Sequence, residues 1–179
     1  MTSIRINDPL LAAAKALLLA MQIGLGICIA AAVIALATYL IAPAKLAEAM
    51  GPIDPSLAWS LPATLAIGMA SLALCFVFVE QLRQIIATVG EGDPFDPQNA
   101  VRLNRMAIHA GGLLICQTVL GYLTPLLHRA IPADGGNASI GFSDLDPSFQ
   151  TLVLAIVLLI LSRVFRHGAA MRADLDGTV

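Results

Sequence analysis

Residues 17–42 read LLLAMQIGLGICIAAAVIALATYLIA, a run without a single charged side chain. A helix of about 20 apolar residues is long enough to cross the hydrocarbon core of a bilayer. The run is also much longer than the ~7 to 15 residues of a signal-peptide core. It therefore predicts a retained membrane span rather than a cleaved leader.

Three further apolar runs follow, at about residues 61–80, 107–127 and 149–165. The chain is 58% hydrophobic and 12% charged, with a mean hydropathy of +0.84, whereas soluble domains carry about 25% charged residues. A spanning segment must satisfy its own backbone hydrogen bonds, so each run predicts a helix. We expect an all-α membrane protein, a single integral membrane domain over residues 1–179, with four transmembrane helices in an antiparallel up-down bundle.

An Asp-Pro pair precedes each apolar run. The pairs are Asp8-Pro9, Asp54-Pro55, Asp96-Pro97 and Asp146-Pro147. Asp can accept hydrogen bonds from the free amides of a first helical turn, and Pro lacks the amide that would go unpaired there. Each pair thus predicts a helix start. Pro62 complicates the second case, which leaves open a kinked outer turn or a separate interfacial piece over residues 55–60.

The cations fall mainly on one side of this arrangement. Eight of the ten Lys and Arg residues lie in the N-terminal segment, the central connection and the C-terminal tail, and the other two are Lys45 and Arg129. Cytoplasmic connections carry an excess of Lys and Arg. The pattern predicts a multi-pass protein of the cell inner membrane with cytoplasmic N- and C-termini. It also predicts a cytoplasmic helical hairpin between the second and third spans.

That central connection, residues 90–106, reads GEGDPFDPQNAVRLNRM. Helical spacing continues past the second span to Gly90, where a helix stop is expected, and Gly92-Asp93-Pro94 is typical of a turn. We expect the ring of Phe95 to pack against the hairpin itself. Val101, Leu103 and Met106 should continue the apolar side, while Asn99, Arg102 and Arg105 should share another face.

The run Gly92-Asp93-Pro94-Phe95, then Asn99, Arg102-Leu103 and Met106, resembles the signature of a bacterial membrane-protein family catalogued as domain of unknown function 2975. In that family a "G, any, P, F, then N, then R-L" pattern joins the second and third of four spanning helices. The resemblance implies a four-helix membrane protein with no established activity, and a regulatory role alongside small helix-turn-helix proteins.

Other signals of chemistry are absent from the sequence. Cys28, Cys75 and Cys116 lie in apolar runs without a CxxC pair, and the chain has no phosphate loop, nucleophile elbow or HExxH motif. We therefore expect a non-enzymatic protein without cofactor or metal. The formal net charge of −2 gives no basic field, so direct nucleic-acid binding is not expected.

Two interpretations of the hairpin stay open. Its candidate site residues are Pro94, Phe95, Asn99, Arg102, Leu103 and Arg105. In the first interpretation they supply turn and cap chemistry, with the arginines at lipid headgroups. In the second they form a docking face, and the protein is an anchor or sensor that engages a cytoplasmic, helix-turn-helix type regulator. A second copy of the chain is a further candidate partner.

The competing hypothesis is a small membrane transporter or cofactor-binding protein with a site between the helices, around Gln22, Cys75, His109 and Gln117. No Asp, Glu, Lys or Arg lies near the centre of a predicted span, which disfavours ion-coupled transport. Gln22 and Gln117 are instead expected to make hydrogen bonds between helices.

Overall fold

The computed structural model describes residues 9–42, 54–130 and 147–176. Within these ranges it contains four helices: α1 (Pro9–Ile41), α3 (Ser60–Gly90), α4 (Pro97–Ala130) and α5 (Pro147–Asp176). All four are long and apolar enough to cross a membrane. The expected all-α fold class is confirmed, and the chain has the character of a multi-pass membrane protein.

The helices are longer than the apolar runs that predicted them. They contain 33, 31, 34 and 30 residues, which at 1.5 Å per residue corresponds to about 45 to 51 Å. The hydrocarbon core of a bilayer is only ~30 Å thick. In α3 and α4 the excess lies mainly in residues 81–90 and 97–106, so the α3–α4 connection is built on helices that continue beyond the apolar runs.

Proline marks the start of three helices. Pro9, Pro97 and Pro147 are the first residues of α1, α4 and α5. The Oδ1 atom of Asp96 accepts a hydrogen bond of 2.9 Å from the backbone N–H of Gln98, which confirms the predicted cap at this position. Asp8 and Asp146 lie outside the described residues.

The second Asp-Pro pair does not start a helix. A turn occupies residues 55–59, and α3 begins only at Ser60. The hydroxyl and the backbone N–H of Ser56 donate to Oδ1 of Asp54 at 2.8 and 2.9 Å, and these bonds hold the pKa of Asp54 below its ordinary value. Of the two alternatives left open by the sequence, the separate piece before α3 is observed.

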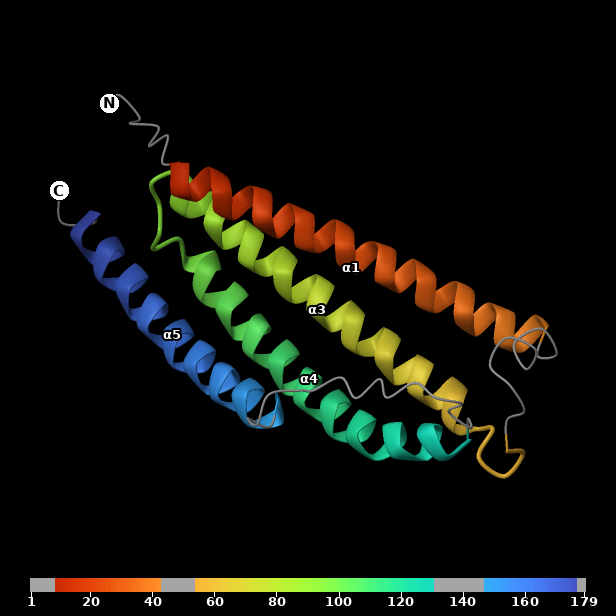
Figure 1. Cartoon of the computed structure of the whole chain (residues 1–179). Coiled ribbons are helices and arrows are strands. Elements are labelled where there is room, and N and C mark those ends of the chain that lie inside the picture. Colours follow the sequence, from red (N-terminus) through yellow and green to blue (C-terminus); the bar gives the residue numbers. More distant parts are fainter. Residues whose placement is uncertain (1–8, 43–53, 131–146, 177–179) are drawn as a thin grey trace.

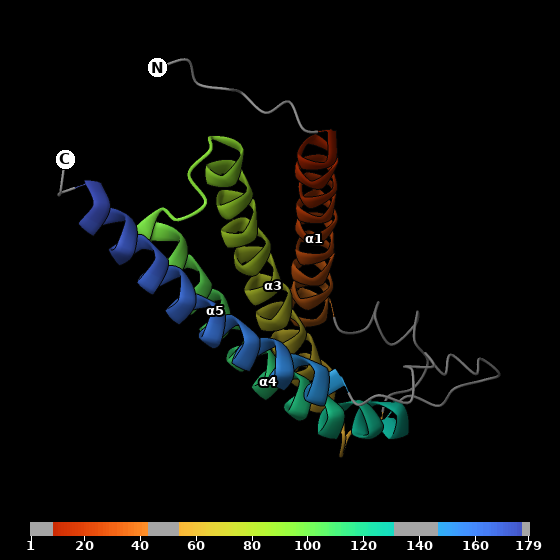
Figure 2. The same cartoon turned by 90° about the vertical axis from the view of Figure 1, so that its left-hand side faces the viewer.

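The four helices pack in chain order into an open layer. Backbone contacts join α1 to α3, α3 to α4 and α4 to α5, and they join no other pair of the described helices. The helices lie side by side in Figure 1, and Figure 2 shows α1 and α5 on opposite sides of the array. The described residues therefore do not form a bundle closed by a contact between its first and last helices.

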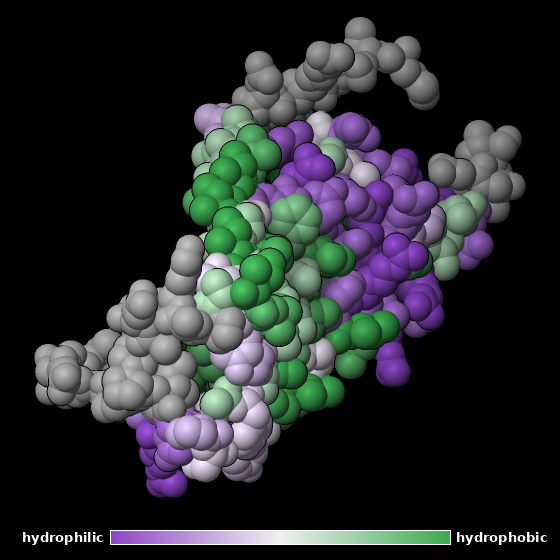
Figure 3. All heavy atoms as spheres, turned by 90° about the vertical axis from the view of Figure 1, so that its right-hand side faces the viewer, coloured by the Kyte–Doolittle hydropathy of each residue, from purple (hydrophilic) through white to green (hydrophobic). Residues whose placement is uncertain are grey.

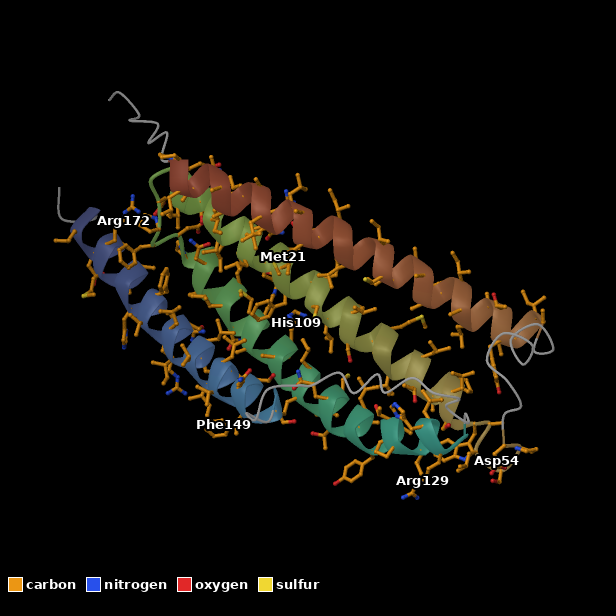
Figure 4. All side chains as sticks on the ribbon, in the orientation of Figure 1. Met21, Asp54, His109, Arg129, Phe149 and Arg172 are labelled. Atoms are coloured by element: carbon orange, nitrogen blue, oxygen red, sulfur yellow. The ribbon has the colours of Figure 1, made fainter. Side chains whose placement is uncertain are left out.

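One end of the layer collects segments that are distant in sequence. The start of α1, the α3–α4 connection and the end of α5 lie together at this end, which we call the hairpin end (Figure 1). Figure 4 places Arg172 there, and it places Asp54 and Arg129 at the opposite end.

The best-packed core lies on the hairpin side of the layer, at the junction of α3, α4 and α5. It consists of Ile85, Leu103, Met106, Ala107 and Leu158, with Phe78, Leu82 and Phe165 packed against it. No residue of α1 belongs to this cluster. The helices that carry the α3–α4 connection are thus fixed by a core that they share with α5.

The middle of the layer exposes its apolar side chains. Only 6% of the most apolar window of α1 is buried, and Ile27 and Ile34 are 65% and 66% exposed. A helix that is hydrophobic all round needs an apolar environment to cover it. Figure 3 shows hydrophobic residues across the middle of the molecule and hydrophilic residues gathered toward its ends, which is the pattern expected of lipid contact.

Candidate functional site

The end of α3 is closed by a left-handed glycine. Gly92 has φ +85°, and its N–H donates to the carbonyl of Val89 at 3.1 Å, while the N–H of Asp93 donates to the carbonyl of Thr88 at 3.1 Å. This pair of bonds is a Schellman motif, which satisfies carbonyls left free at a helix end. The sequence predicted a stop at Gly90, the last helical residue, but the conformation that requires glycine is at Gly92.

Gly90 has a different role, because it allows α1 to approach. A Cβ atom added at this position would lie 2.7 Å from Cδ2 of Leu11 and 3.3 Å from Nζ of Lys15. Both distances are shorter than ordinary carbon contacts of about 3.5 to 4 Å. The start of α1 therefore rests directly on the last turn of α3.

Asn99 is the centre of the hairpin's hydrogen bonding. Its side chain is fully buried, with a relative exposure of 0%. Its Nδ2 donates to Oγ1 of Thr88 at 2.8 Å and to the carbonyl of Pro94 at 3.2 Å, and its Oδ1 accepts from Nη1 of Arg102 at 2.9 Å. One side chain thus ties together the end of α3, the turn and the first turns of α4.

Phe95 packs on α5 rather than on the hairpin, so the sequence prediction for its ring was wrong. The ring centroids of Phe95 and Phe165 are 5.7 Å apart. A Cβ atom added at Gly168 would lie 2.8 Å from Cδ1 of Phe95, so the ring lies directly over the glycine. The expectation failed because a pattern of neighbouring residues carries no information on a helix 70 positions away.

Two polar contacts join α5 to the same region. A guanidinium nitrogen, Nη1 of Arg172, forms an ion pair with Oδ1 of Asp93, and both side chains are about half exposed. The hydroxyl of Ser162, which is buried, donates to the carbonyl of Ala100 at 2.9 Å. The turn, the start of α4 and the end of α5 therefore form one folded unit, which we call the head.

The candidate residues from the sequence divide between the interior and the surface of the head. Asn99 and Leu103 are buried, Pro94 and Arg102 are half-buried, and Phe95 and Arg105 are exposed. Asn99, Arg102 and Arg105 therefore do not form one exposed face as expected. Val101 is 47% exposed and lies off the apolar side to which the sequence assigned it.

Several residues of the head were not singled out from the sequence. They are Thr88, which is hydrogen-bonded to Asn99, Asp93, which pairs with Arg172 of α5, and Gly168 of α5, which lies under the ring of Phe95. Asp93 lay within the quoted motif, but its partner Arg172 is 79 positions away. Gly168 carried a weak signal, because a glycine inside a long helix costs about 1 kcal/mol and such a position often has a packing reason.

Two hydrogen bonds between helices match the expectation for the glutamines. Nε2 of Gln22 in α1 donates to Oε2 of Glu80 in α3 at 2.8 Å. The hydroxyl of Thr151 in α5 donates to Oε1 of Gln117 in α4 at 3.0 Å. Both predicted roles are confirmed, and Glu80 is a partner that the sequence did not suggest.

A largely apolar groove of about 600 Å³ lies between the helices, and all four contribute to its lining. The residues that line it include Leu18, Met21, Cys75, Ala110 and Leu154. Of the residues proposed for a site between the helices, only Cys75 lines it. Figure 4 shows His109 in the middle of the array, and its Nδ1 is buried and makes no hydrogen bond to any described residue.

No group of three or more His, Cys, Asp or Glu residues that could hold a metal ion occurs within the described part of the chain. The head exposes an aromatic ring, guanidinium groups and the end of α5.

Comparison with known proteins identifies a family for this arrangement. A protein-family model described as "Protein of unknown function (DUF2975)" matches residues 44–179. The matched segment contains α3, α4, α5 and every residue of the head, which confirms the resemblance seen in the hairpin motif. No curated protein matches the chain, and no solved structure matches it.

Proposed function

The chain belongs to the DUF2975 family of proteins of unknown function, and we propose that it is a non-enzymatic membrane anchor or sensor that engages a cytoplasmic regulatory protein. The observation that carries this proposal is the head, in which segments 70 to 80 positions apart are fixed together by the Phe95 ring on Gly168 and the Asp93–Arg172 ion pair. A surface assembled in this way is suited to recognition by another protein.

The proposed orientation places the head in the cytoplasm. In this proposal the four helices form an antiparallel array across the inner membrane, with both termini and the hairpin on the inner side. The support is the distribution of Lys and Arg, eight of which lie on the side of the hairpin and two on the other. Arg129 marks the outer side among the described residues.

Cysteine labelling tests this orientation. In a background without Cys28, Cys75 and Cys116, we expect an impermeant maleimide to label Arg129→Cys in intact cells, and to label Gln98→Cys only after permeabilisation. Both positions are exposed. Labelling of Gln98→Cys in intact cells would place the head outside and would overturn the proposed partner.

The docking surface of the head is apolar at its centre. Met171 and Leu175 are 64% and 70% exposed and follow Gly168 at helical spacing, so they continue the face on which Phe95 packs. Phe95 itself is 43% exposed. This strip lies beyond the predicted fourth span, where exposed apolar residues mark interaction sites. Arg172 at its edge is consistent with a partner surface of acidic character.

Partner capture tests the surface. Gentle-detergent purification of the protein with the double substitution Met171→Gln and Leu175→Gln should recover at least tenfold less of the cytoplasmic partner than the unaltered protein. The reason is that losing one central apolar contact costs about 1.4 kcal/mol or more, which is tenfold in affinity. Arg129→Gln, at the opposite end, is the control and should leave capture unchanged. Equal capture by the double variant would contradict the proposal.

The groove between the helices supports a second candidate function, the binding of an apolar small molecule. Its volume of about 600 Å³ and its lining from four helices are suited to a lipophilic ligand. The same purification distinguishes the two functions. If the protein binds a ligand in the groove, a lipophilic molecule should co-purify both with the unaltered protein and with the variant whose head is altered.

A further inference from the structure

A second cavity, of about 360 Å³, lies between α1 and α3 near the hairpin end. Its lining consists of Lys15, Leu19, Arg83, Gln84 and Ala87. Two cations from different helices thus line one space together with an apolar wall. This cavity plays no part in the head or in the large groove.

The cavity is lined by two cations, and the carboxylate of Glu80 beside it is already engaged by hydrogen bonds. Glu80 accepts hydrogen bonds from Gln22 at 2.8 Å and from Gln84 at 2.9 Å. It also accepts two bonds from Arg83, through Nε at 2.9 Å and Nη2 at 3.0 Å. These bonds hold the carboxylate, and the Nη1 group of Arg83 makes no hydrogen bond within the described residues.

Lys15 supplies the charge that is not compensated. It forms no ion pair within the described ranges, and its Nζ would lie 3.3 Å from a Cβ atom at Gly90. The ammonium group is therefore held over the last turn of α3, where the helix dipole favours a cation. None of the described residues supplies its counter-charge.

The position of the cavity identifies the ligand. Leu19 is 51% exposed and lies one helical turn from Lys15 toward the apolar part of α1. A cationic rim above an apolar wall, at the level where the hydrocarbon run begins, fits the boundary between a lipid headgroup and its acyl chains. Basic pockets between spanning helices bind anionic lipid headgroups in this way.

We propose that the cavity between α1 and α3 binds the phosphodiester headgroup of an anionic phospholipid, with Nζ of Lys15 and Nη1 of Arg83 contacting its phosphate oxygens and the acyl chains running along Leu19. The site is separate from the proposed partner surface. It depends on residence in a membrane and not on the identity of any regulator.

Native mass spectrometry of the full chain in mild detergent tests the site, with phosphatidylglycerol and phosphatidylcholine as probes. We expect phosphatidylglycerol to be retained preferentially, and Lys15→Gln to lower its apparent affinity about fivefold, since one basic residue near a bilayer surface contributes ~1 kcal/mol. Lys15→Arg should retain binding. Lys15 is exposed, so these changes should leave the fold intact, which helicity by circular dichroism verifies.

Arg163→Gln is the matched control, because Arg163 is an exposed cation of α5 near the polar end of its apolar run and α5 makes no backbone contact with α1. It should bind phosphatidylglycerol like the unaltered protein. An equal loss in Arg163→Gln, or no loss in Lys15→Gln, would overturn the proposed site. Inorganic phosphate should not displace the lipid; efficient displacement would assign the cavity to a soluble phosphate compound and overturn the lipid assignment.

Discussion

Replacing Asn99 by alanine is expected to lower the free energy of opening of the hairpin by about 3.5 to 5 kcal/mol. The substitution removes two neutral hydrogen bonds, each worth about 1 kcal/mol, and one bond to a guanidinium, worth about 1.5 to 3 kcal/mol. It also leaves the hydroxyl of Thr88 and the carbonyl of Pro94 with fewer partners in a buried space. The turn should then separate from α3 far more often.

Hydrogen exchange measured by mass spectrometry checks this result. Peptides covering residues 88–103 should lose protection in Asn99→Ala, whereas peptides from the opposite end of α4 should not. The control is Gln98→Ala, because Gln98 is exposed and, among the described residues, its side chain accepts a single bond, of 3.2 Å, from Arg102. Unchanged protection of residues 88–103 in Asn99→Ala would show that the buried amide does not hold the hairpin.

Replacing Gly168 by leucine is expected to detach the end of α5 from the turn. The new Cβ atom would start 2.8 and 2.9 Å from two ring carbons of Phe95, so the ring must leave its position beside Phe165. Overpacking of this kind costs about 1 to 3 kcal/mol, and the aromatic contact contributes a further ~0.5 to 1.5 kcal/mol. Leucine is the better helix former, so the helix itself should persist.

The measurement is again local exchange protection, here in residues 165–172, together with capture of the partner, which should fall with it. Gly111→Leu provides the matched control in α4, because an added Cβ atom there meets nothing within 4 Å. Loss of protection in both variants would point to a general effect of leucine rather than to the contact with Phe95. Unchanged protection in Gly168→Leu would contradict the packing described here.

The sequence was sufficient to predict the helices but not the way they pack. Apolar runs about as long as the hydrocarbon core is thick leave few alternatives to helix. The Asp-Pro pair at Asp96 fixes a start because both residues act within one turn. The order of packing depends on which apolar faces meet. In α1 those faces are nearly uniform, so nothing in the run 17–42 predicts that its backbone contacts α3 alone among the described helices.

The same distinction between local and distant contacts applies to the candidate site. Turn and cap residues could be predicted, since the motif around Pro94 concerns neighbours in the chain. The positions of Phe95 and Asp93 could not, because their partners Phe165 and Arg172 lie on another helix. Asn99 was identified as part of the site, yet spacing alone placed it on a surface, whereas three hydrogen bonds explain its burial.

Because α1 lies at the edge of the layer, it forms a part of the molecule that is distinct from the core shared by α3, α4 and α5. This helix contributes nothing to the shared core, lies before the start of the matched family segment at residue 44, and forms one complete wall of the cavity that contains Lys15. We expect a chain severed between α1 and α3 to retain the proposed recognition surface and to lose the proposed lipid pocket. The two proposed activities are therefore genetically separable, and each can change during evolution without loss of the other.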